Sequence, residues 1–297
     1  MLNPFLQKKE EMAIDFLRTM ERPEGYYLAF SGGKDSVVIK HLAEKAGVKF
    51  RAVYRVTSVD PPELVQFIKE KHPDVEREIP HDEEGNPMTM WSIIVNQGML
   101  PIRWKRYCCE KLKESGGQGM LTITGVRWAE SVNRSRNQGK VTIQGKKVGQ
   151  EFADNPDFGQ TDRGGVVLLN DNTESRELIE SCYKKRKVLV NPIIDWTDAE
   201  VWEYIRSEGI PYCKLYDEGF SRLGCIGCPM ARYDRRKKDF DRWPKYKEAY
   251  MRAITKMQAR RREKGLPERM TPEQAFAWWI EDPNIEGQLS MFDEEEE

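Results

Sequence analysis

A short glycine-rich turn between a strand pattern and a helix pattern constrains this chain more than any other feature. Residues 31–36 read Ser-Gly-Gly-Lys-Asp-Ser, the run 26–30 before them is apolar, and Val37 and Val38 continue a helical pattern after them. A Gly-Gly pair lets the backbone turn tightly and leaves no Cβ in the way of a ligand. The amides at the helix N-terminus then face that ligand, and the helix dipole favours an anion. The sequence therefore predicts a phosphate-binding loop.

The polar side chains of this turn suit a diphosphate. Lys34 adds a positive charge, and Asp35 is expected either to cap the helix or to help hold a magnesium ion. The turn is not a Walker loop, because the spacing Gly-x-x-x-x-Gly-Lys is absent. An ordinary glycine-rich turn is the alternative. The residues expected to bind phosphate are Ser31, Gly32, Gly33, Lys34, Asp35 and Ser36.

Strand and helix patterns alternate through much of the chain. Helical patterns follow residues 33 and 61, and apolar or β-rich runs lie at 26–30, 49–56, 75–79, 120–125 and 187–194. Such alternation is typical of a parallel sheet with helices on both faces. We therefore predict an α/β fold with a doubly wound, mostly parallel sheet.

Three parts are expected along the chain. Asn3 and Pro4 cap and open an amphipathic helix within residues 1–24. Residues 25–230 form the sheet domain with the glycine turn and the cysteines, and residues 231–297 form a helical, basic extension with an acidic tail.

The sheet domain holds a polar insertion at about 129–178, with hairpin-like pieces at 140–148 and 164–169. Long segments of this kind are usually lids or binding loops where they are ordered. After the insertion, Thr197-x-x-Glu200 is a capping box that predicts a helix start.

Composition excludes several classes of protein. Lys and Arg total 48 and Asp and Glu total 49, so the net charge of −1 gives no global argument for a polyanionic partner. Apolar runs stay well short of the roughly 20 residues that cross a bilayer. The first residues also lack the pattern of a signal peptide. We expect a cytoplasmic protein without membrane contact.

The six cysteines are unevenly placed. Cys225-x-x-Cys228 has the spacing of a metal-binding pair, and Cys108-Cys109 is an adjacent pair. Adjacent cysteines suit a larger cluster better than a single zinc ion, whose ligand pairs normally lie two to four residues apart. Cys182 and Cys213 are interpreted as small buried hydrophobes.

Several motifs in one order resemble the phosphoadenosine phosphosulfate (PAPS) reductase family of the PP-loop adenine-nucleotide α-hydrolase-like superfamily. The resemblance covers about residues 25–232. Its motifs are the loop 31–36, the Cys108-Cys109 pair after an Arg-rich approach, Thr124-Gly125-Val126-Arg127, the segment 191–196 (Asn-Pro-Ile-Ile-Asp-Trp), the Ile-Pro-Tyr of 210–212, and Gly224-Cys225-x-x-Cys228.

This resemblance implies ATP with Mg²⁺ as ligands, cleaved between the α- and β-phosphates. In the adenosine-phosphosulfate reductase branch, and in the ATP pyrophosphatases of DNA phosphorothioation, such cysteines bind a [4Fe-4S] cluster. Position by position the resemblance implies Cys108, Cys109, Cys225 and Cys228 as ligands. Zinc, or a thiol set without metal, is the alternative.

One departure from the family concerns the reaction. Sulfonucleotide reductases carry a nucleophilic cysteine near the C-terminus, whereas the 69 residues after Cys228 contain none. Without such a thiolate no thiosulfonate intermediate is expected. The loop sequence is also more similar to the ATP-cleaving members than to the reductases.

Three further side chains are candidates for the site. Asp60 follows the second predicted strand and could hold a ribose hydroxyl or the metal, or only cap the next helix. Arg127 and Arg134 follow a predicted strand end and could neutralise phosphate charge, with salt-bridged surface arginines as the alternative. We take Lys34, Asp35 and Arg127 as the candidate catalytic set.

The segment 232–264 carries 14 basic and 5 acidic residues and is expected to be a basic helix. Its interleaved aromatic residues are Tyr233, Trp243, Tyr246 and Tyr250. Such a helix can track a nucleic-acid backbone and stack bases, or its aromatics can instead dock it on the core.

The leading hypothesis is an ATP pyrophosphatase that adenylates a substrate for sulfur transfer, with nucleic acid as a possible acceptor. A cysteine desulfurase or another sulfur donor would then be a partner. The alternatives are a sulfonucleotide reductase-like enzyme and a non-catalytic nucleotide-binding subunit of a nucleic-acid modification or defence complex.

Overall fold

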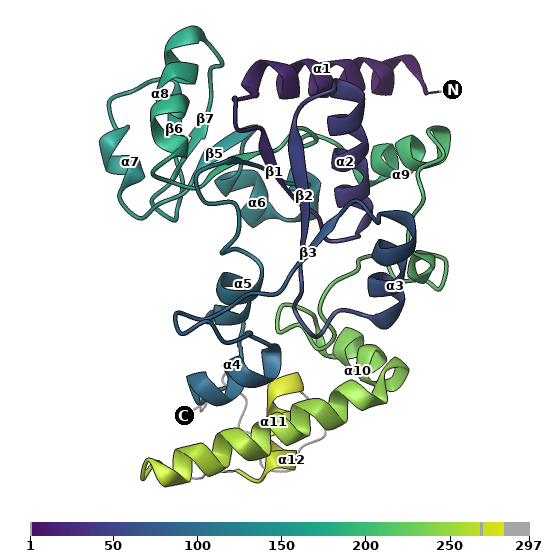
Figure 1. Ribbon diagram of the computed structural model, residues 1–297, viewed down its shortest axis with the longest axis vertical. Helices are drawn as coiled ribbons and strands as arrows, with labels where there is room; N and C mark the ends of the chain where they lie inside the picture. The colour runs from purple at the N-terminus through teal and green to yellow at the C-terminus, as the bar shows by residue number, and fades with distance from the viewer. Residues whose placement is uncertain (1, 268–269, 282–297) are drawn as a thin grey trace, which may run out of the picture. The chain divides into compact units, whose positions relative to one another are not determined.

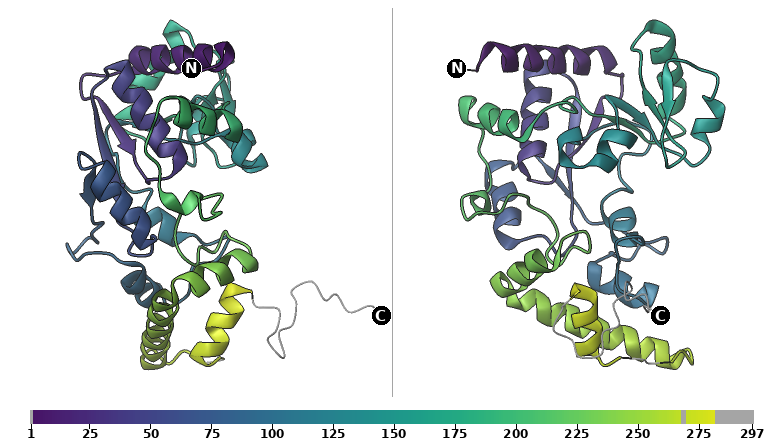
Figure 2. Two further views of the ribbon diagram at one scale, coloured as in Figure 1. Left: turned by 90° about the vertical axis from the view of Figure 1, so that its right-hand side faces the viewer. Right: turned by 180° about the vertical axis from the view of Figure 1, so that it is seen from behind.

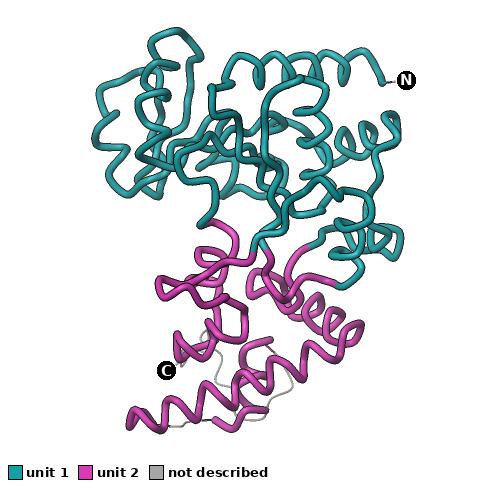
Figure 3. The backbone as a smooth tube through the Cα atoms, in the orientation of Figure 1, with its two compact units in different colours: residues 1–55, 62–78, 115–223 teal, residues 56–61, 79–114, 224–297 magenta. Residues whose placement is uncertain are grey.

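The computed structural model describes residues 2–267 and 270–281. The chain forms two compact units, each built from separate segments. The sheet unit comprises residues 1–55, 62–78 and 115–223, and the helical unit comprises residues 56–61, 79–114 and 224–297 (Figure 3). The acidic tail expected at residues 293–297 lies outside the described residues.

An eight-stranded sheet in the order β3-β2-β1-β4-β8-β5-β7-β6 forms the centre of the sheet unit (Figure 1). The first five strands pair in parallel and the last three add on antiparallel. The strands are β1 (Tyr26–Ala29), β2 (Phe50–Arg55), β3 (Glu76–Glu78), β4 (Leu121–Ile123), β5 (Val141–Ile143), β6 (Phe158–Gln160), β7 (Val166–Leu168) and β8 (Val188–Val190). The mostly parallel α/β fold expected from the sequence is confirmed.

The central parallel strands β1, β4 and β8 are short, apolar and buried. Every residue of β4 and β8 is buried, as are three of the four residues of β1. Strands buried on both faces lose the alternation of polar and apolar residues and read as continuous apolar runs. The polar loops at the strand ends are therefore the places left for binding groups.

The helices of the sheet unit begin and end at recognisable signals. Asn3 caps α1 through the amide of Leu6, and Thr197 caps α9 through the amide of Glu200, as the sequence predicts. In the views of Figures 1 and 2, α1 packs on α2, which packs on α9. The helices are α1 (Pro4–Met20), α2 (Lys34–Ala46), α3 (Pro62–Lys71), α6 (Val132–Asn137), α7 (Val148–Glu151), α8 (Thr173–Tyr183) and α9 (Asp198–Ser207).

The polar insertion is an extension of the sheet. The two hairpin-like pieces expected at 140–148 and 164–169 do not fold on themselves; instead β5 and β7, which they contain, pair with each other. β5 also pairs with β8 and so joins the insertion to the parallel strands. The insertion therefore supplies hydrogen-bond partners for the backbone of β8, which would otherwise be an edge strand. Polar composition alone did not reveal this role.

The helical unit contains α4 (Met90–Gln97), α5 (Tyr107–Leu112), α10 (Tyr233–Arg242), α11 (Pro244–Glu263) and α12 (Pro272–Ile280). The single basic helix expected over 232–264 is wrong, because Trp243 and Pro244 divide it into α10 and α11. A proline has no N–H to donate and opens a new helix more readily than it continues an old one.

The aromatic residues of that segment divide into two kinds. Trp243 and Tyr250 are buried, and Tyr250 makes ring contacts with Phe240 and Trp279. The docking interpretation therefore holds for these two residues. No helix in the described part of the chain is long and apolar enough to cross a membrane.

Candidate functional sites

The glycine turn after β1 has the geometry of a close backbone approach. Gly32 has φ +72°, in the left-handed region. A Cβ on Gly32 would lie 2.8 Å from side-chain atoms of Leu64 and Ile68 in α3. Gly125, after β4, is equally confined, since its Cβ would lie 2.9 Å from Cβ of Asp35. Side chains at either position would push apart the elements that form the turn.

The polar groups of the turn bond within the sheet unit. The Ser36 hydroxyl donates to the carbonyl of Gly33 at 2.8 Å, and the Gly33 amide donates weakly to Ser31 Oγ at 3.4 Å. The Lys34 amide, which is the first of α2, donates to the hydroxyl of Tyr216 at 2.8 Å. The helix amide expected to face an anion therefore has a phenol oxygen as its acceptor.

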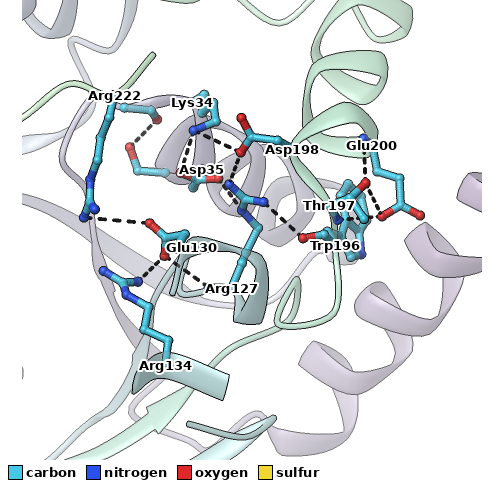
Figure 4. A network of polar contacts seen from close by, with 12 residues as sticks. Lys34, Asp35, Arg127, Glu130, Arg134, Trp196, Thr197, Asp198, Glu200 and Arg222 are labelled. Carbon is cyan, nitrogen blue, oxygen red and sulfur yellow. Dashed lines mark hydrogen bonds and ion pairs between the residues drawn. The ribbon is translucent and has the colours of Figure 1, made fainter. Parts of the chain in front are cut away.

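Two cations and two carboxylates form a network beside the turn, the loop network, made of Lys34, Asp35, Arg127 and Asp198 (Figure 4). Lys34 Nζ lies 3.4 Å from Asp198 Oδ1 and 3.6 Å from Asp35 Oδ2. Arg127 donates from Nε to Asp35 at 2.7 Å and from Nη2 to Asp198 at 2.5 Å. The structure thus brings the three candidate catalytic residues together.

Arg127 is a buried cation, with 1% of its surface exposed. Its Nη1 also donates to the carbonyl of Trp196 at 3.1 Å. Burial lowers the pKa of the guanidinium, but Asp35 and Asp198 outweigh this and raise it overall. Burial raises the pKa of Asp198, whereas Arg127 and Lys34 lower it to below its ordinary range. Arg127 is therefore not a surface arginine, and both Arg127 and Asp198 are charged.

Arg134 has a different partner. It is paired with Glu130, four residues before it on the chain, and Arg222 Nη2 lies 3.8 Å from the same carboxylate (Figure 4). Glu130 also accepts from the Arg127 amide at 3.3 Å. The salt-bridged alternative describes Arg134 in this structure.

Two residues of this site are missing from the set expected from the sequence. Asp198 was visible only as a member of the Thr197-x-x-Glu200 capping box, although it is the first residue of a helix that follows a strand of the sheet. Tyr216 lies in a 3₁₀ helix, Lys214–Tyr216, and no sequence signal connects it with the turn 182 residues earlier.

The helical unit gathers a second group, the cysteine quartet of Cys108, Cys109, Cys225 and Cys228. The first two lie on α5, and the other two lie on the loop before α10. The Cys108 and Cys109 thiols are hydrogen bonded, and the Cys108 thiol also interacts electrostatically with Cys225 and Cys228. Among the described residues, no three His, Cys, Asp or Glu side chains are grouped so as to ligate one metal ion.

The loop of residues 225–228 is held by its neighbours. The Ile226 amide donates to the carbonyl of Val59 at 2.8 Å, and the Tyr250 hydroxyl donates to the carbonyl of Ile226 at 3.0 Å. Arg236, 1% exposed, donates to the carbonyls of Cys228 at 3.0 Å, of Pro229 and of Trp279. The C-terminal helices therefore fix the loop from which two of the thiols project.

The quartet lies in a charged setting. Lys113 is hydrogen bonded to Cys225 and its Nζ lies 3.8 Å from Asp60 Oδ1. Burial lowers the pKa of Lys113, but the charges of Cys225 and Asp60 raise it well above its ordinary value. Burial raises the pKa of Cys225 to about 12. The hydrogen bond between the adjacent thiols raises the pKa of Cys108 and lowers that of Cys109.

Asp60 belongs to the helical unit, whereas the loop residues 31–36 belong to the sheet unit. Its Oδ2 accepts from Thr57 at 2.8 Å. Its expected role toward a ribose or a metal stays a prediction. Cys182 and Cys213 are buried in the sheet unit, as expected.

The fold and the loop geometry define a nucleotide-binding α/β protein of the PP-loop class. The chain belongs to the phosphoadenosine phosphosulfate reductase domain family, which matches residues 25–231, more than half of its length. The family resemblance seen in the sequence motifs is thereby confirmed.

Individual relatives are more distant. An uncharacterized protein of Methanocaldococcus jannaschii is 28% identical over 257 residues, covering 80% of this chain and 44% of that protein. Adenosine 5′-phosphosulfate reductase 2 of Bacillus subtilis is 23% identical over 241 residues, covering 77% of this chain and 84% of the enzyme. The PAPS reductase of Candida auris, solved as a phosphate complex, is 15% identical with a TM-score of 0.42, covering 77% of this chain and 98% of that one. The chain spans less than half the length of this M. jannaschii protein and of a second uncharacterized protein from the same organism.

Proposed function

We propose that this chain is an ATP pyrophosphatase that adenylates an acceptor for sulfur transfer. The observation that supports this most is the loop network, in which two cations alternate with two carboxylates at the N-terminus of α2. Lys34 and Arg127 each contact both Asp35 and Asp198. A polyphosphate with a divalent cation matches this arrangement, because each of its charges has a counterpart of opposite sign.

The exchange of partners follows from this charge pattern. When ATP binds, its β- and γ-phosphates replace the two carboxylates as partners of the Lys34 and Arg127 side chains. The same phosphates also accept hydrogen bonds from the amides at the α2 N-terminus. Asp35 and Asp198 are then free to accept a hard cation, and carboxylate oxygens are the ligands that Mg²⁺ prefers. When bound, Mg²⁺ would neutralise charge on the leaving pyrophosphate.

The proposed reaction has two displacements. An acceptor oxygen attacks the α-phosphorus, the bond to the bridging oxygen breaks, and pyrophosphate leaves while the acceptor proton passes to water. Lys34 and Arg127 stabilise the charge that develops on the departing group. The terminal sulfur of a donor persulfide then attacks the carbon that carries the AMP group, forming the carbon–sulfur bond and releasing AMP. A dithiol reductant cleaves the resulting disulfide bond, which frees the thiolated product and the donor cysteine and leaves the reductant as its disulfide.

We further propose that the cysteine quartet holds a [4Fe-4S] cluster. Four soft thiol donors interact within the helical unit, and the cations Lys113 and Arg236 beside the 225–228 loop offset thiolate charge. When bound, the cluster would supply either a structural anchor or, if one iron is open, a site for sulfide. Zinc is the alternative occupant.

The acceptor is proposed to be nucleic acid, and a cysteine desulfurase is the proposed sulfur donor. The exposed cations of α10 and α11 support the first proposal, although buried Trp243 and Tyr250 leave only the half-buried Tyr233 and Tyr246 for stacking. Trp104 is 71% exposed between Arg103 and Lys105 and offers a further stacking group.

The test follows the α-phosphate. Purified protein is incubated with Mg²⁺, α-labelled ATP and candidate nucleic-acid acceptors. The proposal expects AMP and pyrophosphate, abolished in Lys34→Ala and unaffected by Lys8→Ala on an exposed face of α1. Release of ADP, or sulfite release from a sulfonucleotide with a thiol reductant, would contradict the proposal.

A further inference from the structure

Tyr216 occupies the place at the α2 N-terminus where an anion would bind. Its hydroxyl is the acceptor for the Lys34 amide at 2.8 Å. The same oxygen lies over the glycine turn, since a Cβ on Gly33 would be 3.5 Å from it. Burial raises the pKa of the Tyr216 phenol, so the group is neutral.

The ring of Tyr216 belongs to a cluster of three aromatic residues. It meets Trp202 of α9 edge-on with ring centroids 4.9 Å apart, and Tyr212 at 6.4 Å. Its backbone is fixed by the 3₁₀ helix, whose Leu215 and preceding Cys213 are fully buried. The side chain itself is only half-buried. A rotation of the side chain can therefore move the hydroxyl without unfolding the segment that carries it.

An amide has one hydrogen, so it makes one full-strength hydrogen bond. A charged phosphoryl oxygen is a stronger acceptor than a neutral phenol, by roughly a factor of two in bond strength. We infer that the Tyr216 hydroxyl is a stand-in for a phosphoryl oxygen, and that nucleotide binding displaces it from the Lys34 amide. Tyr216 thereby selects for ligands with enough charge to displace it.

This inference rests on the proposed function in placing phosphate at the Lys34 amide. It also has a consequence for the neighbouring ring. Displacement of Tyr216 breaks its edge contact with Trp202, so the fluorescence of Trp202 reports the exchange. A phosphate that bound elsewhere would leave both the amide and the ring contact as they are.

Tyr216 could instead act as a phosphate ligand, and this role predicts a different effect of its removal. If Tyr216 stayed in place and donated its own O–H to the phosphate, it would be a ligand and its loss would weaken binding. Removal of a displaced competitor instead strengthens binding. The sign of the effect of Tyr216→Phe therefore separates the two roles.

The experiment measures binding of inorganic pyrophosphate by calorimetry, with Mg²⁺ present. Tyr216→Phe should bind roughly two- to tenfold tighter than the wild type, as expected when one neutral hydrogen bond no longer opposes binding. Tyr212→Phe is the matched control, because its hydroxyl bonds Asp217 at 3.0 Å, and it should bind like the wild type. Unchanged or weaker binding by Tyr216→Phe would overturn the inference.

Two further readouts do not depend on affinity. Pyrophosphate should change the tryptophan fluorescence of the wild type much more than that of Trp202→Phe. Equal changes in the two proteins would count against displacement. Hydrogen exchange of the Lys34 amide without ligand should be faster in Tyr216→Phe. Lys34→Ala tests the site separately: if it binds pyrophosphate as the wild type does, the proposed function fails whatever Tyr216 does.

Discussion

Arg127 and Asp35 are joined by a 2.7 Å hydrogen bond although 92 residues separate them in the chain. The contact connects the end of β4 with the first turn of α2, and Gly125 makes it possible because a side chain there would meet Asp35. Asp198 at the start of α9 closes the same network. Three elements of the sheet unit thus meet at one set of charges beside the glycine turn.

Replacement of Arg127 tests the network as a structural unit. Arg127→Met should destabilise the protein by about 2 kcal/mol, because it removes the charged donor of Asp35 and Asp198 and leaves the Trp196 carbonyl without its hydrogen bond. Asp35→Asn should relieve part of that loss, so the double variant should be more stable than the sum of the single effects predicts. Urea unfolding of the four proteins measures the coupling. Simple additivity would show that the pair is not a unit.

Gly32 and Gly47 form a matched pair for the glycine turn. Both have positive φ, +72° and +69°, but a Cβ on Gly32 meets Leu64 and Ile68 whereas a Cβ on Gly47 has no atom within 4 Å. Gly47→Ala should therefore lose only the roughly 1 kcal/mol of backbone strain. Gly32→Ala should lose clearly more in the same unfolding assay and should also weaken pyrophosphate binding. Equal losses would show that the turn has room for a side chain.

Burial of His72 predicts how stability depends on pH. Its ring packs on Phe30 and Phe67, and burial, with Lys40 nearby, lowers its pKa to about 4 against the opposing charges of Asp74 and Glu44. In the unfolded state His72 binds a proton near pH 6.5, whereas in the folded state it binds one only near pH 4. The free energy of unfolding therefore decreases as the pH falls below about 6.5. Between pH 7 and pH 5 this amounts to about 2 kcal/mol.

His72→Phe removes this titration. The difference in unfolding free energy between the wild type and His72→Phe should therefore change with pH in that window, while contributions from other groups cancel. Denaturant unfolding at pH 7, 6 and 5 measures it. A difference that stays constant across the three values would mean that His72 titrates normally in the folded protein.

Arg236 gives a prediction for the proposed cluster. Its hydrogen bonds hold the carbonyls of Cys228 and Pro229, so Arg236→Met should loosen the loop of residues 225–228. Loss of such an outer contact typically weakens metal affinity by roughly 10- to 100-fold. Iron per chain after anaerobic reconstitution and desalting should therefore fall, whereas the exposed Lys237→Met on the same helix should load like the wild type. Equal iron in both variants would contradict the role of Arg236.

The sequence predicted the elements whose signals are local. The strand, turn and helix around residues 26–46, the capped starts of α1 and α9, and the parallel part of the sheet all follow from apolar periodicity and capping residues. The antiparallel part of the sheet did not, because β5 pairs with β7 and β8, which lie far from it along the chain. Pro244 was a readable signal for the break between α10 and α11.

The same distinction applies to the candidate sites. Lys34 and Asp35 are given by a motif, and Arg127 by its place after a strand. Asp198 and Tyr216 reach the turn only through the tertiary fold, so no spacing along the chain could assign them. The interaction among the four cysteines joins residues more than 100 positions apart, which only the family resemblance suggested in advance.

The most direct test is a crystal structure of the protein with Mg²⁺ and an ATP analogue that cannot be cleaved between its α- and β-phosphates. The account predicts the β- and γ-phosphates at the α2 N-terminus, on the Lys34 amide and the side chains of Lys34 and Arg127. The Tyr216 hydroxyl would be displaced, and Asp35 and Asp198 would face the cation. Phosphates bound away from α2, with the Lys34 amide still bonded to Tyr216, would contradict it.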